Sequence, residues 1–270
     1  MFLTRLVTGL LLSALTLYLF LQTKSYAEPF LAIAFIVAAW EWSRLAEYKH
    51  LISRLLYTLC ATAIVPLLSY VVFTLNYLDL RHLSLFTSFF WAGIGFALWM
   101  NRRTLRHAGP GLRGFLGLIL LPVSALLALS LLQNDAPSAL PLLVLIALVA
   151  ISDSVAYIVG SLLGRHRLAP ALSPKKSWEG FIAGFSATIL LGTPLLQWCF
   201  PSVDIVWLGL LAGGISLFAL FGDLAESALK RMAGVKDSGR LLPGHGGVLD
   251  RIDAIFGALP LFAWVFFTVG

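Results

Sequence analysis

The sequence is poor in charge. Only 12% of its 270 residues are Asp, Glu, Lys or Arg, whereas soluble domains carry about 25%. Hydrophobic residues make up 59%, and the mean hydropathy is +0.91. A soluble fold would have no place for this much apolar surface, so the expected solvent is the lipid bilayer. The composition therefore predicts an all-α, polytopic integral membrane protein.

Cysteine is also scarce. The two cysteines, Cys60 and Cys199, lie within one apolar run and at the end of another, and neither has the spacing of a metal ligand or a redox pair. Nothing therefore indicates a disulfide scaffold. The sequence also lacks a soluble domain, a low-complexity tract and a clear internal repeat.

Long apolar runs are what the sequence does have. A helix needs about 20 apolar residues to cross the hydrocarbon layer. The candidate runs are 3–21, 29–46, 55–75, 84–100, 114–133, 138–163, 181–199, 203–222 and 254–269. Turn-forming residues separate them, for example Gly109-Pro110-Gly111 and Asp135-Ala136-Pro137. We therefore expect about nine transmembrane helices.

The lysines and arginines predict the orientation. With the N-terminus in the cytoplasm, nine spans place all of the 19 Lys and Arg residues in cytoplasmic segments except Lys24 and Arg81. This asymmetry is what the positive-inside rule predicts. It also accounts for the formal charge of +6. Because there is no basic repeat with interleaved aromatics, we expect no nucleic-acid partner.

The first run has a second interpretation. Arg5, an apolar core at Leu6 to Leu21 and the small-residue pattern Ser25-Tyr26-Ala27 resemble a cleaved signal peptide. The core is slightly long for that, so a retained helix is favoured. Cleavage would leave the remaining topology unchanged, and the charge pattern does not distinguish the two.

One segment concentrates the charge. Five of the 13 acidic residues lie within 223–253, beside five basic residues and His245. These acids are Asp223, Glu226, Asp237, Asp250 and Asp253. The spacing of Asp223, Ser227 and Lys230 places them on one face of a helix. Gly234 can end that helix.

The rest of this segment has the composition of a phosphate site. Residues 243–247 read Pro-Gly-His-Gly-Gly, a loop whose N–H groups can approach a phosphate because glycine has no Cβ. Asp250 and Asp253 follow at i, i+3 in the last helix. Carboxylates bind Mg²⁺, which takes the rest of its shell from phosphate and water. The pattern favours a site for a metal–polyphosphate complex over an ordinary solvated loop.

Two further features lie upstream. Asp153 sits well inside the sixth run, where a charge is costly, so it should face a polar cavity and not lipid. Ser173-Pro174 has the pattern of a helix N-cap followed by proline, and can start the seventh helix. Lys175 and Lys176 fit either inside-positive charges or contacts to anionic headgroups.

These segments resemble a known family. The signature of phosphatidate cytidylyltransferases (CDP-diacylglycerol synthases) is matched without a gap over 27 residues by Ser227-Ala-Leu-Lys-Arg231, Lys236-Asp237 and Pro243-Gly-His-Gly-Gly-Val-Leu-Asp-Arg-Ile-Asp253. Residues 173–180 are similar to the family's Ser-Pro-Lys-Lys-Thr-Trp-Glu-Gly segment, with Ser177 in place of Thr. Weaker likenesses are Trp40-Glu-Trp42, Asp153 to Tyr157 and Gly164-Arg165. The resemblance is strong over 150–255 and weak before it.

The resemblance implies an activity. CTP and phosphatidate would give CDP-diacylglycerol and pyrophosphate in phospholipid biosynthesis, with Mg²⁺ as cofactor and no covalent enzyme intermediate. Residues 1–135 would then serve packing, dimer or lipid contacts, and 136–270 would form the catalytic region. The family also suggests a homodimer and a second, monovalent cation such as K⁺. We expect the bacterial inner membrane, with the active site facing the cytoplasm.

Residue roles are carried over onto the matching positions. The expected catalytic residues are Asp223, Ser227, Lys230, Arg231, Asp250 and Arg251, of which Asp223 and Asp250 would hold Mg²⁺. The expected substrate and nucleotide contacts are Asp153, Lys175, Lys176, Ser177, Lys236, Asp237, Gly244, His245, Gly246, Gly247 and Asp253. A phosphate-contact role suits His245 better than that of a general base, because phosphatidate is already anionic at neutral pH.

Two other functions stay open. A CTP-dependent polyprenol or phytol kinase resembles this family in using CTP inside a helical membrane fold, but it transfers only phosphate. An ion-coupled transporter would use Asp153 and the acidic cluster as a relay. The transporter alternative leaves the Gly-His-Gly-Gly loop without a purpose.

Overall fold

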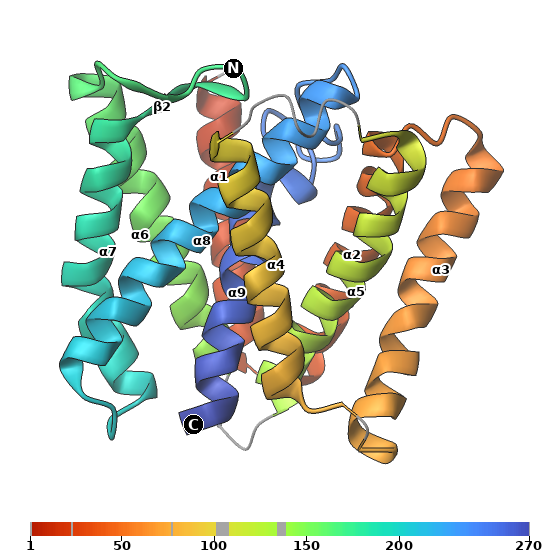
Figure 1. The fold of residues 1–270 in the computed structure, drawn as a ribbon, viewed down its shortest axis with the longest axis horizontal. Coiled ribbons are helices and arrows are strands. Elements are labelled where there is room, and N and C mark those ends of the chain that lie inside the picture. The colour runs from red at the N-terminus through yellow and green to blue at the C-terminus, as the bar shows by residue number, and fades with distance from the viewer. Residues whose placement is uncertain (1, 23, 77, 101–107, 134–138, 270) are drawn as a thin grey trace. The chain divides into compact units, whose positions relative to one another are not determined.

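The computed structural model describes residues 2–22, 24–76, 78–100, 108–133 and 139–269. Its elements, labelled in Figure 1, are α1 (Phe2–Gln22), α2 (Lys24–Leu45), α3 (Leu51–Ser69) with its π-helical continuation η1 (Tyr70–Thr74), α4 (Leu80–Met100), α5 (Pro110–Gln133), α6 (Leu140–Leu163), β1 (Arg167–Ala169), β2 (Ser173–Ser177), α7 (Trp178–Cys199), α8 (Ile205–Met232) and α9 (Leu249–Val269). The predicted turn at 135–137 and the cations Arg102, Arg103 and Arg106 lie outside the described residues.

Six of the described helices are long and apolar enough to cross a membrane. They are Leu51–Thr74, Pro110–Leu132, Leu140–Leu163, Trp178–Cys199, Ile205–Met232 and Leu249–Val269. The protein is therefore an integral membrane protein, as predicted, but the nine spans are not confirmed. In α1 the described apolar stretch is only Leu11–Leu21, and α2 carries Glu28, Glu41 and Arg44.

The chain forms two compact units. The first comprises Met1–Asp79, Arg106–Leu143 and Leu229–Ile252, and the second comprises Leu80–Leu105, Val144–Ala228 and Asp253–Gly270. The boundaries fall inside α8 and α9, so the signature segment belongs partly to each unit. This division follows contacts, and it does not test the functional division predicted at 135/136.

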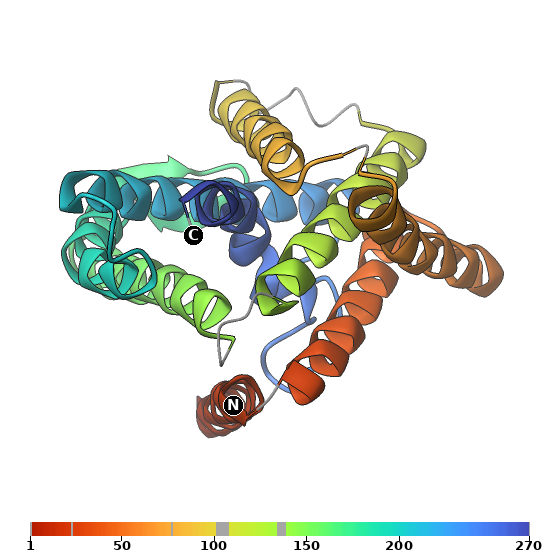
Figure 2. The same cartoon turned by 90° about the horizontal axis from the view of Figure 1, so that it is seen from below.

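In the first unit, α2, α3 and α5 pack against one another, as both views show (Figures 1 and 2). Backbone carbonyls at the start of α5 accept hydrogen bonds from two of the partner helices. Trp42 Nε1 donates to the Arg113 carbonyl over 2.9 Å, and the Tyr57 hydroxyl donates to the Gly114 carbonyl over 3.0 Å. These bonds hold α2 and α3 on α5 and satisfy the buried Trp42 and Tyr57 donors.

A buried arginine secures the C-terminal end of α2. Arg113 is 4% exposed, donates from Nη1 to the Leu45 carbonyl over 2.9 Å, and pairs through Nη2 with Glu47 over 3.1 Å. A cation is favourable at this end of a helix because the last carbonyls have no intrahelical donor. The end of α2 is therefore held firmly in place.

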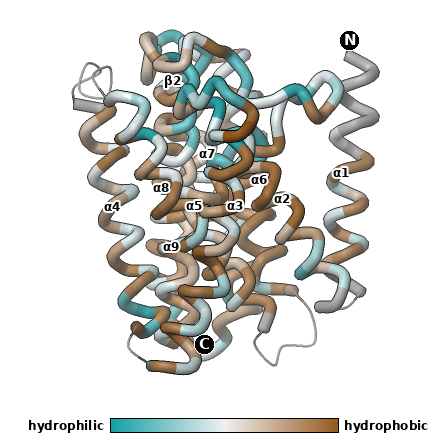
Figure 3. Tube along the Cα trace, turned by 90° about the vertical axis from the view of Figure 1, so that its right-hand side faces the viewer, coloured by the Kyte–Doolittle hydropathy of each residue, from teal (hydrophilic) through white to brown (hydrophobic). Residues whose placement is uncertain are grey.

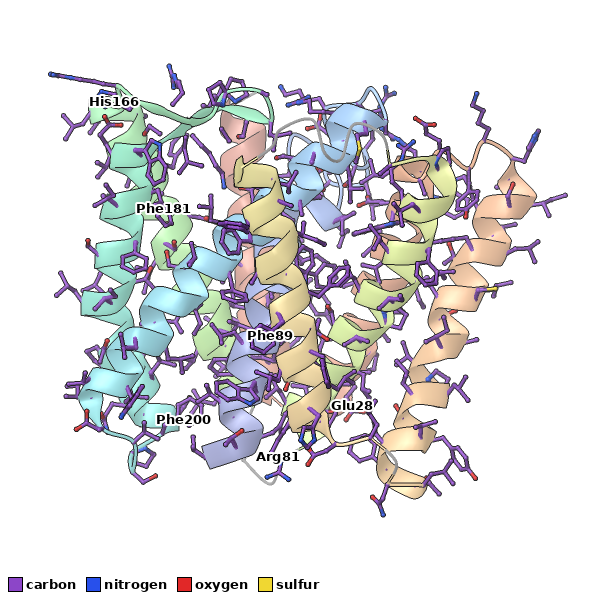
Figure 4. The ribbon with its side chains drawn as sticks, viewed as in Figure 1. Glu28, Arg81, Phe89, His166, Phe181 and Phe200 are labelled. Carbon is purple, nitrogen blue, oxygen red and sulfur yellow. The ribbon has the colours of Figure 1, made fainter. Side chains whose placement is uncertain are left out.

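In the second unit, a short hairpin joins α6 and α7. Strands β1 and β2 are antiparallel, with Arg167 opposite Ser177 and Ala169 opposite Ser173. Figure 3 draws the segment around β2 largely in teal and α6 mostly in brown. Figure 4 labels His166 beside the hairpin and Phe200 at the opposite end of α7. Helix α7 thus runs from a polar hairpin through an apolar middle to a second turn.

The hairpin corrects two sequence predictions. The described residues are mainly helical, as predicted, but β1 and β2 add a two-stranded hairpin to the expected all-α fold. Ser173-Pro174 does not start the seventh helix, because residues 173–177 are extended and pair with β1. The N-cap is Ser177, whose hydroxyl accepts from the Gly180 N–H over 3.2 Å.

Candidate active site

Helix α8 carries the first part of the signature, as its spacing predicted. It continues unbroken to Met232, so Asp223, Ser227 and Lys230 do lie along one helix. Gly234 has φ +67, and its N–H donates to the Arg231 carbonyl while that of Val235 donates to the Lys230 carbonyl. This is the Schellman arrangement that satisfies the last helical carbonyls. The predicted stop at Gly234 is confirmed.

In the first unit, Asp250 lies at the centre of a dense hydrogen-bond cluster. Its side chain is 4% exposed, and Oδ1 pairs with Lys230 Nζ over 2.8 Å. Oδ2 accepts from the Gly247 N–H over 2.7 Å, and the Ser238 N–H lies 2.9 Å from Oδ2 and 3.2 Å from Oδ1. One cation and two amides therefore hold this carboxylate. Lys230 and Asp250, both predicted, are brought together.

The glycine loop is folded around protein acceptors. The N–H groups of His245 and Gly246 both donate to the Leu242 carbonyl, and Leu242 donates back to the Gly246 carbonyl. The next amide, that of Gly247, is used by Asp250. Gly246 has φ +89°, a backbone conformation that residues with a side chain rarely adopt. A Cβ at this position would also lie only 2.6 Å from Asp250 Oδ2. Here glycine makes room for a carboxylate of the protein, which the sequence pattern had not indicated.

Sequence reasoning noted Trp40-Glu-Trp42 as a weak likeness to the family but gave Glu41 no role in the site. This residue of α2 is 4% exposed, and its carboxylate accepts from the Ser238 hydroxyl, the Val248 N–H and the Leu249 N–H. An acidic residue in an otherwise apolar helix was the available signal, because such a charge needs specific partners. Those partners are separated from it by 197 or more positions, which is why no local pattern revealed them.

Other predicted residues of this unit have different surroundings. The His245 ring lies against α1, where its Nε2 is 3.4 Å from the position of a Cβ on Gly9. The Asp237 carbonyl accepts from Arg44 Nη2 over 3.1 Å. The exposed predicted residues are Arg231, Lys236, Asp237, Gly244 and Arg251. The three cations among them, Arg231, Lys236 and Arg251, are therefore accessible to an anionic ligand.

In the second unit, Lys176 and Asp223 form an ion pair whose side chains are each about a quarter exposed, 25% and 26%. Asp223 Oδ1 also accepts from the Ser227 hydroxyl over 3.2 Å. Burial lowers the pKa of Lys176, but the carboxylates of Asp223, Asp153 and Asp253 raise it by more, so the net direction is upward. Three predicted carboxylates thus act on one predicted cation.

Asp153 is an exposed residue of α6, and its charge contributes to the raised pKa of Lys176. That it faces a polar cavity stays a prediction. Asp253 also accepts from the Ala254 N–H over 2.8 Å near the start of α9. Lys175 is exposed on the hairpin, whereas Ser177 is buried as the cap of α7. A capping role is the one that the structure gives to Ser177.

The two carboxylates predicted to hold Mg²⁺ differ in their suitability. Among the described residues no group of three or more His, Cys, Asp or Glu side chains has a metal-binding arrangement, but Mg²⁺ commonly needs only one or two carboxylates beside phosphate and water. Asp223 fits such a role, since it is partly exposed and its neighbouring carboxylates already attract a cation. Asp250 fits only if one of its protein donors releases an oxygen.

Known proteins resemble this chain over its whole length. The model of the cytidylyltransferase family matches residues 3–269. A phosphatidate cytidylyltransferase of Pseudomonas aeruginosa is 34% identical over 98% of this chain and 97% of its own length. That of Haemophilus influenzae is 33% identical over 96% of both chains, and that of Staphylococcus epidermidis is 48% identical over 42% of this chain and 44% of its own.

The chain therefore belongs to the cytidylyltransferase family of integral membrane proteins. The family suspected from the signature segment is confirmed over the whole chain, including the N-terminal part where the sequence resemblance was weak. The relatives at 33–34% identity span nearly the full length.

Proposed function

We propose that the protein transfers the cytidylyl group of CTP to phosphatidate, forming CDP-diacylglycerol and releasing pyrophosphate. The observation that carries this proposal is the full-length similarity to relatives named phosphatidate cytidylyltransferase. The Lys230–Asp250 and Lys176–Asp223 pairs support it, because both are built from residues of the predicted site.

The reaction is an in-line substitution. A phosphate oxygen of phosphatidate bonds to the α-phosphorus of CTP, while the bond from that phosphorus to the bridging oxygen breaks and its electrons leave with pyrophosphate. The attacking oxygen is already anionic at neutral pH, so no strong general base is needed. Catalysis then depends on positioning and on cations that stabilise charge on the transferring and leaving groups.

The exposed cations are suited to that task. Arg231, Lys236 and Arg251 are exposed and near the ordered Lys230–Asp250 pair in sequence, and Lys175 lies beside Lys176. Lys176 is protonated at neutral pH, since its carboxylate neighbours raise its pKa against the effect of burial. These residues would offset the triphosphate charge before and after the bond is broken.

Magnesium is the expected cofactor. Asp223 would hold it, with Asp250 as a second ligand if a donor is exchanged, and a monovalent cation such as K⁺ would add to the same charge balance. When bound, Mg²⁺ neutralises phosphate charge and orients the triphosphate. The contribution of the chain is to keep Asp223 partly exposed and Asp250 fixed.

The proposed topology has nine spans, with the N-terminus and the active site on the cytoplasmic side of the bacterial inner membrane. Nearly all cations then lie inside, and CTP reaches the site from water while phosphatidate reaches it from lipid. A homodimer is proposed with it, and no nucleic-acid partner.

The test is direct. Purified protein receives CTP with phosphatidate, or with a polyprenol or phytol, in Mg²⁺ or in EDTA, and the lipid product is identified by mass. We expect CDP-diacylglycerol from phosphatidate with Mg²⁺ only. A phosphorylated isoprenoid alcohol would identify a kinase. Solute flux in proteoliposomes without CTP turnover would identify a transporter.

A further inference from the structure

We infer that Glu41 is a positioning residue of the cytidylyl-transfer site: its carboxylate holds the signature loop and the start of α9 so that Asp250 keeps one geometry. The inference rests on the proposed function. Glu41 lies in α2, far from the signature in sequence. Its hydrogen-bond partners are Ser238, Val248 and Leu249, which belong to the signature segment but are not among the predicted site residues.

The contacts of Glu41 are specific and buried. Oε2 accepts from the Ser238 hydroxyl over 2.9 Å and from the Leu249 N–H over 2.8 Å, and Oε1 accepts from the Val248 N–H over 3.2 Å. Val248 and Leu249 lie at the N-terminus of α9, where the first amides have no intrahelical acceptor and a negative charge is favourable. A residue of one helix thus caps another.

Ser238 connects Glu41 to Asp250. Its hydroxyl donates to Glu41, while its own N–H donates to Asp250. The three successive N–H groups at 247–249 are shared between the same two carboxylates. That of Gly247 donates to Asp250, and those of Val248 and Leu249 donate to Glu41. Movement of Glu41 would therefore move two of the groups that hold Asp250.

The surrounding glycines leave space for the Glu41 carboxylate. A Cβ on Gly239 would collide with Oε1, and a Cβ on Gly247 would collide with Oε2 and with the Ser238 hydroxyl. Two glycines of the signature region are thus explained by a residue outside it. This fit indicates that the loop is built around Glu41.

The C-terminal end of α2, which carries Glu41, is itself held by α5. Three residues after Trp42, the Leu45 carbonyl is capped by Arg113, and Trp42 is hydrogen-bonded to the Arg113 carbonyl. Glu41 is therefore attached to a helix end that α5 holds. Because a displacement of about 1 Å can cost about 10²-fold in rate, a fixed anchor for this loop has a catalytic consequence.

The experiment measures kcat and KM for CTP in full-length Glu41→Gln, per folded molecule. Glutamine keeps the shape but presents N–H groups to donors. We expect kcat to fall about 10²-fold with KM within about threefold. Ser238→Ala, which keeps the N–H to Asp250 and loses only the hydroxyl, should lower kcat about 10-fold. The effects should not add in the double variant, because the two residues share one bond.

Asp204→Asn is the matched control, because Asp204 is also an acid whose carboxylate accepts a hydrogen bond from a helix-start N–H, that of Val206 in α8. It should keep wild-type kcat. If Glu41 served stability alone, the variants would yield less folded protein, but each folded molecule would keep the wild-type kcat. Folded Glu41→Gln and Ser238→Ala with kcat within about twofold of wild type would therefore overturn the inference. If Glu41→Gln does not fold, Ser238→Ala alone decides. Wild-type protein that makes no CDP-diacylglycerol would instead overturn the proposed function.

Discussion

Asp250 and Asp223 are both acids of the signature region paired with a lysine, yet their surroundings differ. Asp250 is 4% exposed and is held by Lys230 and two backbone amides. The Asp223 side chain is 26% exposed, and its described bonds are to two side chains, those of Lys176 and Ser227. One carboxylate is fixed by the fold, and the other is accessible to a ligand.

This difference separates two duties of an active site. A fixed carboxylate determines where a cationic partner and a loop lie, at the cost of desolvating both charges. An accessible carboxylate can exchange its lysine for a metal or for water. The amino-acid type and the motif do not distinguish these duties, whereas burial and hydrogen-bond partners do.

The largest expected effect is that of Asp250→Asn. It removes one charge of the largely buried Lys230–Asp250 pair, which costs about 3–5 kcal/mol of the free energy of unfolding. We also expect activity to fall by at least about 10³-fold. Thermal unfolding in detergent and CDP-diacylglycerol formation measure the two. Asp204→Asn, at an exposed helix start where Asn also caps, serves as the control. If Asp250→Asn unfolded at the wild-type temperature, Asp250 would not be the structurally fixed carboxylate of the two.

Asp223→Asn should separate activity from stability. The pair with Lys176 is partly solvated, so its loss costs less than about 1 kcal/mol, while activity falls about 10²-fold or more if Asp223 holds Mg²⁺. When the residual activity of Asp223→Asn is titrated with Mg²⁺, the concentration needed for half-maximal activity should be higher than in the wild type. An unchanged Mg²⁺ requirement with wild-type activity would remove Asp223 from the metal site.

Gly247→Ala tests the crowding around the fixed carboxylates. The added methyl collides with Ser238 and Glu41, so we expect a loss of about 1–3 kcal/mol in the free energy of unfolding. In Gly111→Ala the methyl enters open space, and no such loss is expected. Equal unfolding temperatures for the two variants would contradict the described packing.

The smallest effect concerns pH. The pKa of Lys176 is raised above its ordinary value of 10.5, so its contribution to stability is complete below that value and is lost only as the pH rises through the raised pKa. Between about pH 7 and 9 the pH–rate profiles of wild type and Lys176→Arg should therefore run parallel. A fall in that range in the wild type alone would show that Lys176 loses its proton earlier.

Much of the site could be predicted from sequence because its chemistry is local. The i, i+4, i+7 spacing placed three polar residues on α8, and glycine after the polar stripe predicted where α8 ends. The family signature predicted Lys230 and Asp250 as site residues, and the fold pairs them.

What was not predictable depends on tertiary contact. Glu41 acquires its role from partners brought to it by folding. Ser177 and not Ser173 is the helix cap, because residues 173–177 pair with β1 and α7 begins only after them. Six of the nine predicted spans meet the length and hydropathy of a membrane crossing among the described residues, and α2 does not because it carries Glu28, Glu41 and Arg44.

The central claim is tested most directly by the position of the label in CTP. Wild-type protein with phosphatidate and Mg²⁺ receives CTP labelled with ³²P at either the α- or the γ-phosphate. The account predicts label in the lipid from the α-labelled CTP and in pyrophosphate from the γ-labelled CTP. Label from the γ-phosphate in the lipid, or no label in the lipid from either, would contradict it.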